Sequence, residues 1–247
     1  MANQSIDITT PHGTCDAYVS YPDAGGPFPA VLFYMDGIGF RDTVKKMADR
    51  LASHGYYVLL PNMFYTFGRG QLMTAAEIFN PDNRPRIMQM IMANTSEKLK
   101  SDTQIFLDFI AAQKQVKPGS KIGVTGYCMG GAMVVRAAAV FPDRVAAGGV
   151  FHGGALATDD PQSPHKLLST VKAELYFGHA DNDAFSTAEQ IKTLEAALKA
   201  ANVKFESELY AGAAHGYTME DLPVYNKDAA ERHWTKLLAL FERNLKK

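Results

Sequence analysis

The sequence predicts an α/β fold, in which a mostly parallel sheet carries helices on both faces. Strand-like and helix-like segments alternate from one end of the chain to the other, the pattern typical of such a sheet. Several short segments are apolar throughout, as strands buried on both faces require. The chain has 247 residues, of which 47% are hydrophobic, so it can bury a sizeable core. We therefore expect one domain over residues 1–247.

The expected elements follow in chain order. An opening hairpin is predicted from two strands that turn at Pro11, His12 and Gly13. Further strands are expected at residues 30–35, 56–60, 121–125, 146–151, 173–177 and 205–210. Apolar residues at helical spacing predict helices around residues 44–51, 99–112, 129–140, 191–201 and 230–245.

The composition argues against several kinds of partner and location. A formal net charge of -1 and a pI near 6.7 give no basic face for a nucleic acid. The first residues lack the basic flank and apolar stretch of a signal peptide, and no segment is apolar for long enough to span a membrane. The chain has two cysteines, Cys15 and Cys128. A disulfide between them would leave Cys128 without a free thiol. These observations favour a cytoplasmic protein, with Cys15 as a small core residue.

The most informative segment is Gly126-Tyr127-Cys128-Met129-Gly130. It has the G-x-S-x-G pattern of the nucleophile elbow of α/β-hydrolases, with cysteine in place of serine. A predicted strand precedes it and a predicted helix follows, as an elbow requires. The glycine spacing does not fit the G-x-G-x-x-G of a dinucleotide site, and no acidic residue ends a strand about 20 residues later. We therefore predict that Cys128 is a nucleophile, whose thiolate the start of the following helix favours.

A cysteine nucleophile needs a base, and the base needs an acid that orients it. In this fold the three residues occur in the order nucleophile, acid, base. Asp181 follows the strand at residues 173–177, on a loop over the carboxyl edge of the sheet. His215 lies in a loop of small residues after the next strand. Asp181 is the candidate acid and His215 the candidate base.

Three other residues compete for roles at this site. Asp183 competes with Asp181 directly, although it lies nearer the expected N-cap of the helix that begins around Ser186. His152 and His179 follow central strands at the carboxyl edge, where sites in open α/β sheets lie. Either histidine is therefore a candidate for the wall of the pocket.

The motifs Gly-Tyr-Cys-Met-Gly-Gly, Gly-x-x-Asp and Ala-x-His-Gly, in this order, resemble those of the dienelactone hydrolase family. The resemblance extends over nearly the whole chain. It implies an α/β-hydrolase fold and a Cys-Asp-His triad that cleaves lactones and esters without a metal or cofactor. Carried over by motif, the triad falls on Cys128, Asp181 and His215. The backbone amides of Gly37 and Met129 are then the expected oxyanion donors.

The resemblance also implies an acidic residue that hydrogen-bonds the thiol and helps to form the thiolate. Asp36 stands at that position, where the family typically has a glutamate with one more methylene. The alternative role for Asp36 is to cap a glycine turn. A pair of arginines that clamps a substrate carboxylate is implied as well. Met219 occupies the place of one, and Arg84, with Arg86 as a rival, occupies that of the other, unless these arginines are surface residues.

Apolar and aromatic residues are expected to replace the missing half of this clamp. Tyr65 and Met88 lie in a long excursion after the strand at residues 56–60, and Tyr217 follows the candidate base. Methionines and aromatics form adaptable walls around hydrophobic ligands, although ordinary core packing is the alternative. We therefore expect a substrate that is neutral or hydrophobic.

Together these residues predict a thiol hydrolase that cleaves a small-molecule ester or lactone through an acyl-enzyme, as a monomer or homodimer. Two rival functions use the same three residues, namely a thiol acyltransferase and a hydrolase of activated phosphotriesters. A third is non-enzymatic, a redox-sensing thiol protein on a hydrolase fold.

Overall fold

The computed structural model describes residues 1–246, apart from the side chains of Ala75 and Phe79. The chain divides into two compact units, the first over Met1–Gly119 and the second over Ser120–Lys247. Each unit is an α/β arrangement of its own, as the alternation of the sequence predicts. The single domain over residues 1–247 stays a prediction.

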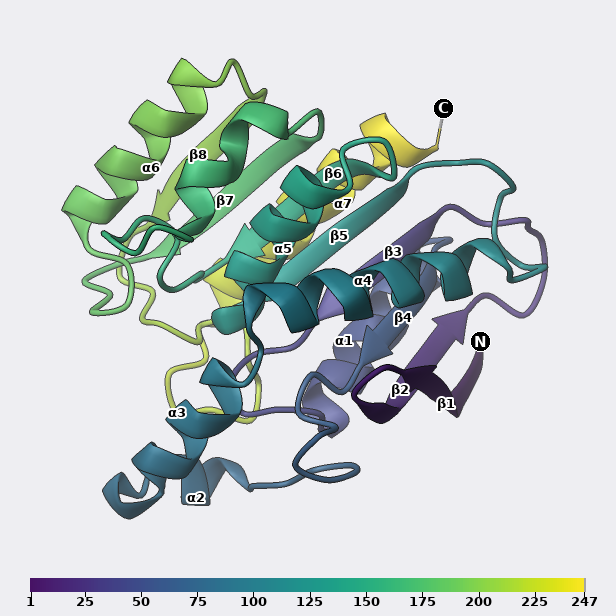
Figure 1. Cartoon of the computed structure of the whole chain (residues 1–247), viewed down its shortest axis with the longest axis horizontal. Helices are drawn as coiled ribbons and strands as arrows, with labels where there is room; N and C mark the ends of the chain where they lie inside the picture. Colours follow the sequence, from purple (N-terminus) through teal and green to yellow (C-terminus); the bar gives the residue numbers. More distant parts are fainter. Residues whose placement is uncertain (247) are drawn as a thin grey trace. The chain divides into compact units, whose positions relative to one another are not determined.

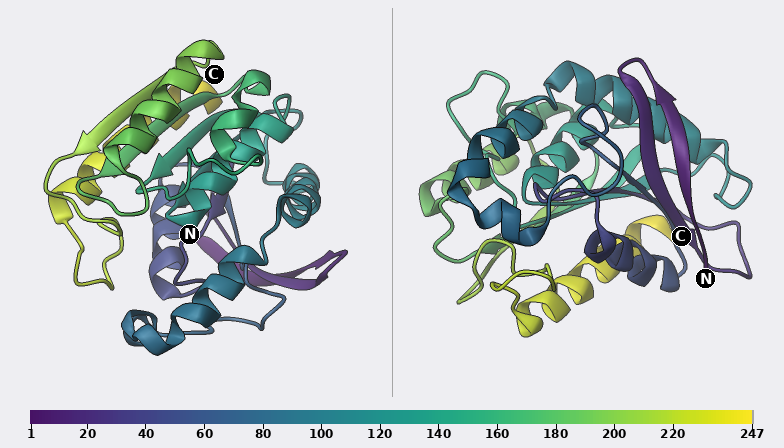
Figure 2. Two further views of the ribbon diagram at one scale, coloured as in Figure 1. Left: turned by 60° about the vertical axis from the view of Figure 1, so that its left-hand side comes forward. Right: turned by 90° about the horizontal axis from the view of Figure 1, so that it is seen from below.

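The first unit contains four strands in the order β1-β2-β4-β3. Strands β1 (Ala2–Thr10) and β2 (Gly13–Tyr21) pair antiparallel as a long hairpin (Figure 2), which confirms the predicted opening hairpin. Strand β4 (Tyr57–Pro61) pairs antiparallel with β2 and parallel with β3 (Ala30–Tyr34). Every residue of β3 and β4 is buried, as their continuous apolar sequences indicate.

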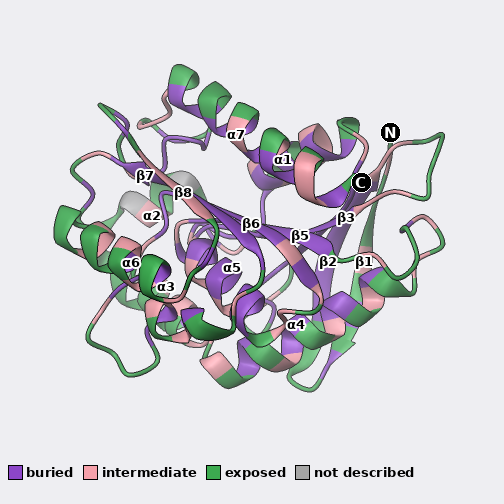
Figure 3. Ribbon diagram, turned by 90° about the horizontal axis from the view of Figure 1, so that it is seen from above, coloured by how far each residue is buried: buried purple, intermediate pink, exposed green. Residues whose placement is uncertain are grey.

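Helices lie on both faces of these strands (Figure 3). Helix α1 (Asp42–Ser53) packs against β2 and β4, and α4 (Ser96–Ala111) packs against β1 and β3. The excursion between β4 and α4 contains α2 (Ala75–Phe79), a 3-10 turn η1 (Pro81–Asn83) and α3 (Arg84–Met92). The sequence predicted the excursion but not its short helices.

The second unit has four strands in sequential order, β5 (Ile122–Tyr127), β6 (Val145–Phe151), β7 (Glu174–Ala180) and β8 (Phe205–Tyr210). Each pairs parallel with the next. All residues of β5 and β7 are buried. Because the strands are parallel, their carboxyl ends lie along the same edge, where sites of open α/β sheets form.

The helices of the second unit cover both faces of its strands (Figures 1 and 3). Helix α5 (Met129–Val140) lies against β5 and β6 on one face, and α7 (Lys227–Leu245) lies on the other. Helix α6 (Ala188–Ala200) connects β7 to β8, and a 3-10 segment η2 (Pro164–Thr170) packs between α5 and α6. Within residues 1–246, no helix has both the length and the apolar composition that crossing a bilayer requires.

Candidate active site

The predicted elbow is a sharp turn between β5 and α5. Cys128 links the strand to the helix with φ 54° and ψ -117°, a conformation that is unusual for a residue with a side chain. Glycine is required at two positions around Cys128, because other backbone atoms lie too close for a Cβ. A Cβ on Gly126 would lie 2.2 Å from the carbonyl oxygen of Gly130. One on Gly131 would lie 2.9 Å from the Cα of Gly153. The turn therefore has the backbone that a nucleophile elbow needs.

The backbone of Cys128 is held from three sides. Its N–H donates to the carbonyl of Phe151 at 3.2 Å, at the end of β6. Its own carbonyl accepts from Gly131 at 3.0 Å and from Gly154 at 3.2 Å. The side chain is partly exposed and the cysteine is free, whereas Cys15 is free but buried. Burial raises the pKa of Cys15 to about 12, which favours its neutral thiol and leaves Cys128 as the candidate nucleophile.

The predicted acid is wrong, because His215 pairs with Asp183 and not with Asp181. Nδ1 of His215 lies 2.6 Å from Oδ2 of Asp183, whose side chain is fully buried. The other oxygen, Oδ1, accepts from the backbone N–H of Phe185 at 2.8 Å. The carboxylate is thus held in place from the protein side while it faces the imidazole, which is the role of an orienting acid.

Asp181 supports the loop that carries the histidine. Its Oδ2 accepts from the N–H of Gly212 at 2.9 Å, and its own N–H donates to the carbonyl of Ala213 at 2.7 Å. Strand β7 continues to Ala180, three residues beyond its predicted end. Asp181 therefore still lies beside the segment that contains Gly212 and Ala213. The carboxylate that contacts His215 belongs to Asp183, two residues later.

One pattern in the sequence indicates that Asp183 is not the N-cap of α6 and is available to pair with His215. The N-cap of α6 is Thr187, which forms a reciprocal capping box with Gln190. The pattern Thr-x-x-Gln before an apolar helix face is a readable helix start. With the helix capped at Thr187, Asp183 is not needed as a cap.

The electrostatics of His215 favour its protonated form. Burial lowers its pKa, but the hydrogen bond that Nδ1 donates to Asp183 and the neighbouring Cys128 side chain more than offset this effect and raise the pKa to about 10. Among the described residues, no atom makes a hydrogen bond of normal geometry with its buried Nε2. The ring therefore lies beside the thiol without a tight bond, as catalytic groups often do in structures without substrate.

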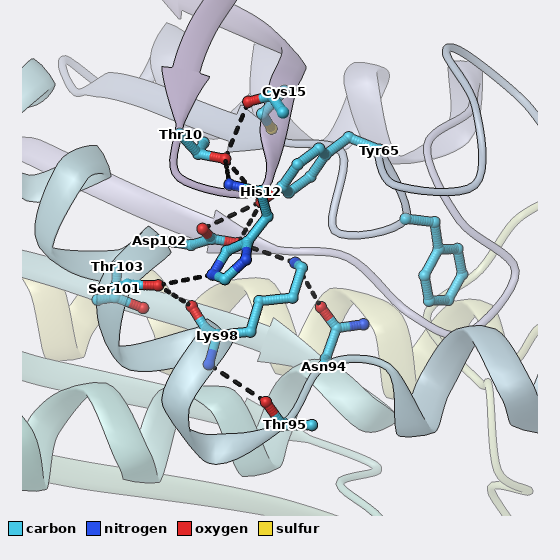
Figure 4. Close-up of polar contacts among 12 residues, drawn as sticks. Thr10, His12, Cys15, Tyr65, Asn94, Thr95, Lys98, Ser101, Asp102 and Thr103 are labelled. Atoms are coloured by element: carbon cyan, nitrogen blue, oxygen red, sulfur yellow. Dashed lines mark hydrogen bonds and ion pairs between the residues drawn. The ribbon is translucent and has the colours of Figure 1, made fainter.

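Two tyrosines predicted to bind substrate are buried. Tyr217 is fully buried, and its hydroxyl donates to the carbonyl of Gly178 at 3.2 Å. Tyr65 is also buried, and its hydroxyl lies 2.8 Å from Oγ1 of Thr10 and 2.9 Å from Oδ2 of Asp102 (Figure 4). These bonds direct both hydroxyls into the protein interior, which favours the core-packing alternative for these residues.

Lys98 completes the polar cluster around Tyr65. Its Nζ lies 2.8 Å from Oδ2 of Asp102, 3.3 Å from Oδ1 of Asn94 and 4.3 Å from the centre of the Tyr65 ring (Figure 4). Lys98 and Asp102 are both buried. The cluster ties the start of α4 to the segment after β4.

Asp36 has the capping role that the sequence left open. Its Oδ1 accepts from the N–H groups of Ile38 and Gly39, at 3.1 and 3.3 Å. Arg41 pairs with both carboxylate oxygens, at 2.7 and 3.0 Å, and this ion pair is buried. A role of Asp36 in thiol activation stays a prediction, and it would have to compete with Arg41 for the carboxylate.

The two expected oxyanion donors belong to different units. Met129 is the first residue of α5, so its N–H has no acceptor within the helix. Gly37 lies in the turn after β3, and it stays a predicted donor. Arg84 and Met88 are exposed on α3, as is Arg86, and a substrate-binding role for Arg84 and Met88 stays a prediction.

A match to a known protein family covers most of the chain. The model of the dienelactone hydrolase family matches residues 15–245. The chain belongs to the dienelactone hydrolase family. This result confirms the resemblance inferred from the motifs, and with it the expectation of a hydrolase family.

Named relatives and a solved structure give the same result. A Methylorubrum extorquens protein called "Putative carboxymethylenebutenolidase" is 26% identical over 246 residues, covering 96% of this chain and 80% of the relative. One of the same name from Escherichia coli K12 is 25% identical over 234 residues, covering 92% and 82%. The crystal structure of a dienelactone hydrolase-like promiscuous phosphotriesterase from metagenomic libraries superposes with a TM-score of 0.82 at 23% identity, covering 99% and 98%. These likenesses confirm the α/β-hydrolase fold.

Within this dienelactone hydrolase family member, Met219 lies where the motif resemblance has an arginine. The Met219 side chain is fully buried in the structure. An arginine there would have its charge in the interior unless the loop moved. Phe185 contrasts with it, because 58% of its surface is exposed while its ring lies 4.9 Å, centre to centre, from that of His215. Sequence reasoning did not single out Phe185, an apolar residue in a loop.

Proposed function

We propose that this chain is a thiol hydrolase that cleaves ester and lactone bonds of small neutral molecules through an acyl-enzyme on Cys128. The observation that carries the proposal is the 2.6 Å contact between His215 and Asp183, with the imidazole beside the thiol at the tip of the elbow. Nucleophile, base and orienting acid are the three parts that covalent acyl transfer needs. Membership of the dienelactone hydrolase family supports the same reaction class.

In the acylation step, His215 holds the proton of the Cys128 thiol on Nε2. The thiolate attacks the carbonyl carbon, a carbon–sulfur bond forms, and the carbonyl electron pair moves to the oxygen. When this intermediate collapses, the bond to the leaving alkoxide breaks and His215 gives it the proton. Asp183 accepts from Nδ1, which orients the ring with Nε2 towards the sulfur and stabilises the imidazolium that donates the proton.

In the deacylation step, water attacks the thioester carbon while His215 takes one of its protons. The carbon–sulfur bond breaks, the acid is released and the thiolate–imidazolium pair is restored. The net reaction adds one water across the ester. Both steps pass through an oxyanion, for which the Met129 amide is one proposed donor and the Gly37 amide the other.

Apolar surface beside the base supports a neutral or hydrophobic substrate. Phe185 exposes its ring next to His215. Met219 provides no positive charge where an anionic lactone would need one. A desolvated carboxylate without a bidentate partner binds poorly, so anionic lactones should be the weaker substrates.

Hydrolysis of activated phosphotriesters is the second candidate function. One solved relative, which aligns with 99% of this chain, is a dienelactone hydrolase-like promiscuous phosphotriesterase. The same nucleophile and base would serve an attack on phosphorus. Acyl transfer to an alcohol or amine uses the same acyl-enzyme and differs only in the acceptor.

The experiment is steady-state turnover of p-nitrophenyl esters, neutral and anionic lactones, and paraoxon by the wild type, Cys128→Ala and Cys15→Ala. We expect ester turnover, a loss of at least about 10³-fold in kcat for Cys128→Ala, and near wild-type rates for Cys15→Ala. Product analysis with an added alcohol separates hydrolysis from transfer. Efficient turnover by Cys128→Ala, or none by the wild type while Cys128 is readily alkylated, would reject the thiol hydrolase.

A further inference from the structure

His152 is a buried histidine in a strained backbone position directly after β6. Its φ is 38°, in the left-handed region that residues with a Cβ seldom occupy. The side chain is 1% exposed. Strained residues persist where the surrounding structure holds them, and they concentrate at functional sites.

The backbone at this position joins the segments that carry the candidate catalytic groups. The N–H of His152 donates to the carbonyl of Gly178 at 2.8 Å, in the strand that leads to Asp183. The carbonyl of the preceding residue, Phe151, accepts from the N–H of Cys128 at 3.2 Å. Two neighbouring residues thus hold both the elbow and the strand that precedes the acid.

The side chain of His152 reaches the third segment. Its Nε2 lies 2.7 Å from Oγ1 of Thr218, three residues after His215 in the same loop. The Thr218 side chain is itself buried. The His152 ring also contacts His215 edge to face, with ring centres 5.1 Å apart and planes at 67°. The loop of the base is therefore both bonded to His152 and packed on it.

The groups that face the two imidazoles give them opposite charge states. Burial lowers the pKa of His152 well below its usual range, and the neighbouring His215 and His233 lower it further. The rings of Tyr127 and Tyr217 also pack on the His152 ring, and burial raises the pKa of Tyr217 well above its usual value. His152 is thus neutral, and it can lie against a protonated His215 without repulsion between two charges.

Around His215, the titratable groups in contact are Asp183 and Cys128, which favour its protonated form, and the neutral His152. Phe185 covers another side of the ring without charge. A sideways shift of the ring, away from the line between the carboxylate and the thiol, would lengthen both of these contacts. The position of His215 thereby affects how well the imidazolium stabilises the thiolate.

We propose that His152 is a positioning residue for the base, which acts by holding the loop of His215 through its hydrogen bond to Thr218. The role rests on the proposed function in so far as His215 is the base of an acyl transfer. It also predicts a property of the resting protein, because the thiolate depends on a correctly placed imidazolium. The rate of Cys128 alkylation measures that property without any substrate.

The test compares Thr218→Val, which removes the hydroxyl at nearly constant shape, with Thr218→Ser, which keeps it. The readouts are the pH at which iodoacetamide alkylation of Cys128 is half-maximal, kcat/KM on a p-nitrophenyl ester, and Tm. We expect Thr218→Val to move the alkylation midpoint to higher pH and to lower kcat/KM by about 10- to 100-fold. Thr218→Ser should restore both values to near wild type.

A double-mutant cycle with His152→Phe, which keeps an aromatic ring against His215 but has no Nε2, completes the experiment. The double variant should lose no more kcat/KM than the more impaired single variant. Each single substitution already removes the same hydrogen bond between residues 152 and 218. An unchanged alkylation midpoint in Thr218→Val, or additive losses in the cycle, would overturn the proposal. If the midpoint shifts as expected but no variant or wild type hydrolyses an ester, the positioning role stands and the proposed function fails.

Discussion

Nδ1 of His215 lies 2.6 Å from Oδ2 of Asp183, whereas Asp181, two residues earlier, accepts a hydrogen bond from the amide of Gly212. The two carboxylates follow the same strand, yet one orients the imidazole and the other supports the loop that carries it. This relationship makes the two aspartates a matched pair for mutagenesis.

Asp183→Asn should lower kcat by about 10²- to 10⁴-fold, because the amide no longer stabilises the imidazolium and favours the wrong tautomer. Asp181→Asn keeps an oxygen that accepts from Gly212 and should retain activity within a few-fold of wild type. Steady-state kinetics on one ester, with circular dichroism to verify folding, measures both. The reverse order of effects would restore Asp181 as the orienting acid.

The pKa of His215 predicts how stability depends on pH. Its folded-state value of about 10 lies above the usual 6.5, so the protonated ring stabilises the folded protein. This contribution is fully present below about pH 6.5 and is lost as the pH rises towards 10. Urea unfolding of the wild type and His215→Gln should therefore show a stability difference that shrinks over that range. A difference that grows with pH would contradict the protonated ring.

The elbow should not tolerate a methyl group at Gly126. The added Cβ would lie 2.2 Å from the Gly130 carbonyl, a clash with backbone that no rotamer relieves. We expect Gly126→Ala to lose at least about 3 kcal/mol of unfolding free energy. Gly119→Ala, where no atom lies within 4 Å and φ is 69°, should lose only about 1 to 2 kcal/mol. Equal losses in chemical denaturation would show that close approach at the elbow is not limiting.

Asp36→Asn distinguishes two roles of Asp36, namely capping the turn at Ile38 and Gly39 and activating the Cys128 thiol. The amide oxygen can still accept from Ile38 and Gly39, but Arg41 loses its buried charge partner. We expect a loss of about 3 kcal/mol in stability and no change in the pH dependence of Cys128 alkylation. An alkylation midpoint that moves while stability holds would assign Asp36 to the thiol instead.

Phe185→Ala tests the apolar surface beside His215. The side chain is 58% exposed, so its removal should change stability by less than about 0.5 kcal/mol. We expect kcat/KM to fall by about 10-fold for aryl or long-chain esters and to stay near wild type for acetate esters of small alcohols. A uniform loss across the ester panel would show that Phe185 positions His215 rather than contacting substrate.

The turn at Cys128, the loop that carries His215 and the strands that precede them were predictable because they depend on local patterns. Glycines around Cys128 and small residues around His215 mark tight turns that the structure contains. The choice between Asp181 and Asp183 was not predictable, because it depends on where β7 ends and how the next loop turns. The capping box at Thr187 was the one pattern in the sequence which indicated that Asp183 does not cap α6.

Side-chain direction was the other property that the sequence could not supply. Tyr65 and Tyr217 follow strands at the expected edge, but both hydroxyls turn inward to buried partners. His152 and His179 were equivalent candidates after central strands. The structure places His152 against His215, whereas His179 bonds Ser207 at 3.2 Å, and burial lowers its pKa to about 4. Tertiary packing, which a single sequence does not encode locally, decided each case.

The most direct test of the account is to trap the acyl-enzyme. The wild type, Cys128→Ala and Cys15→Ala are mixed with a p-nitrophenyl ester, quenched in acid within the first turnovers and analysed by intact-protein and peptide mass spectrometry. The acyl-enzyme mechanism predicts one acyl group on the peptide that contains Cys128, in the wild type and Cys15→Ala only. Ester turnover that survives in Cys128→Ala, or an acyl group on another residue, would contradict it.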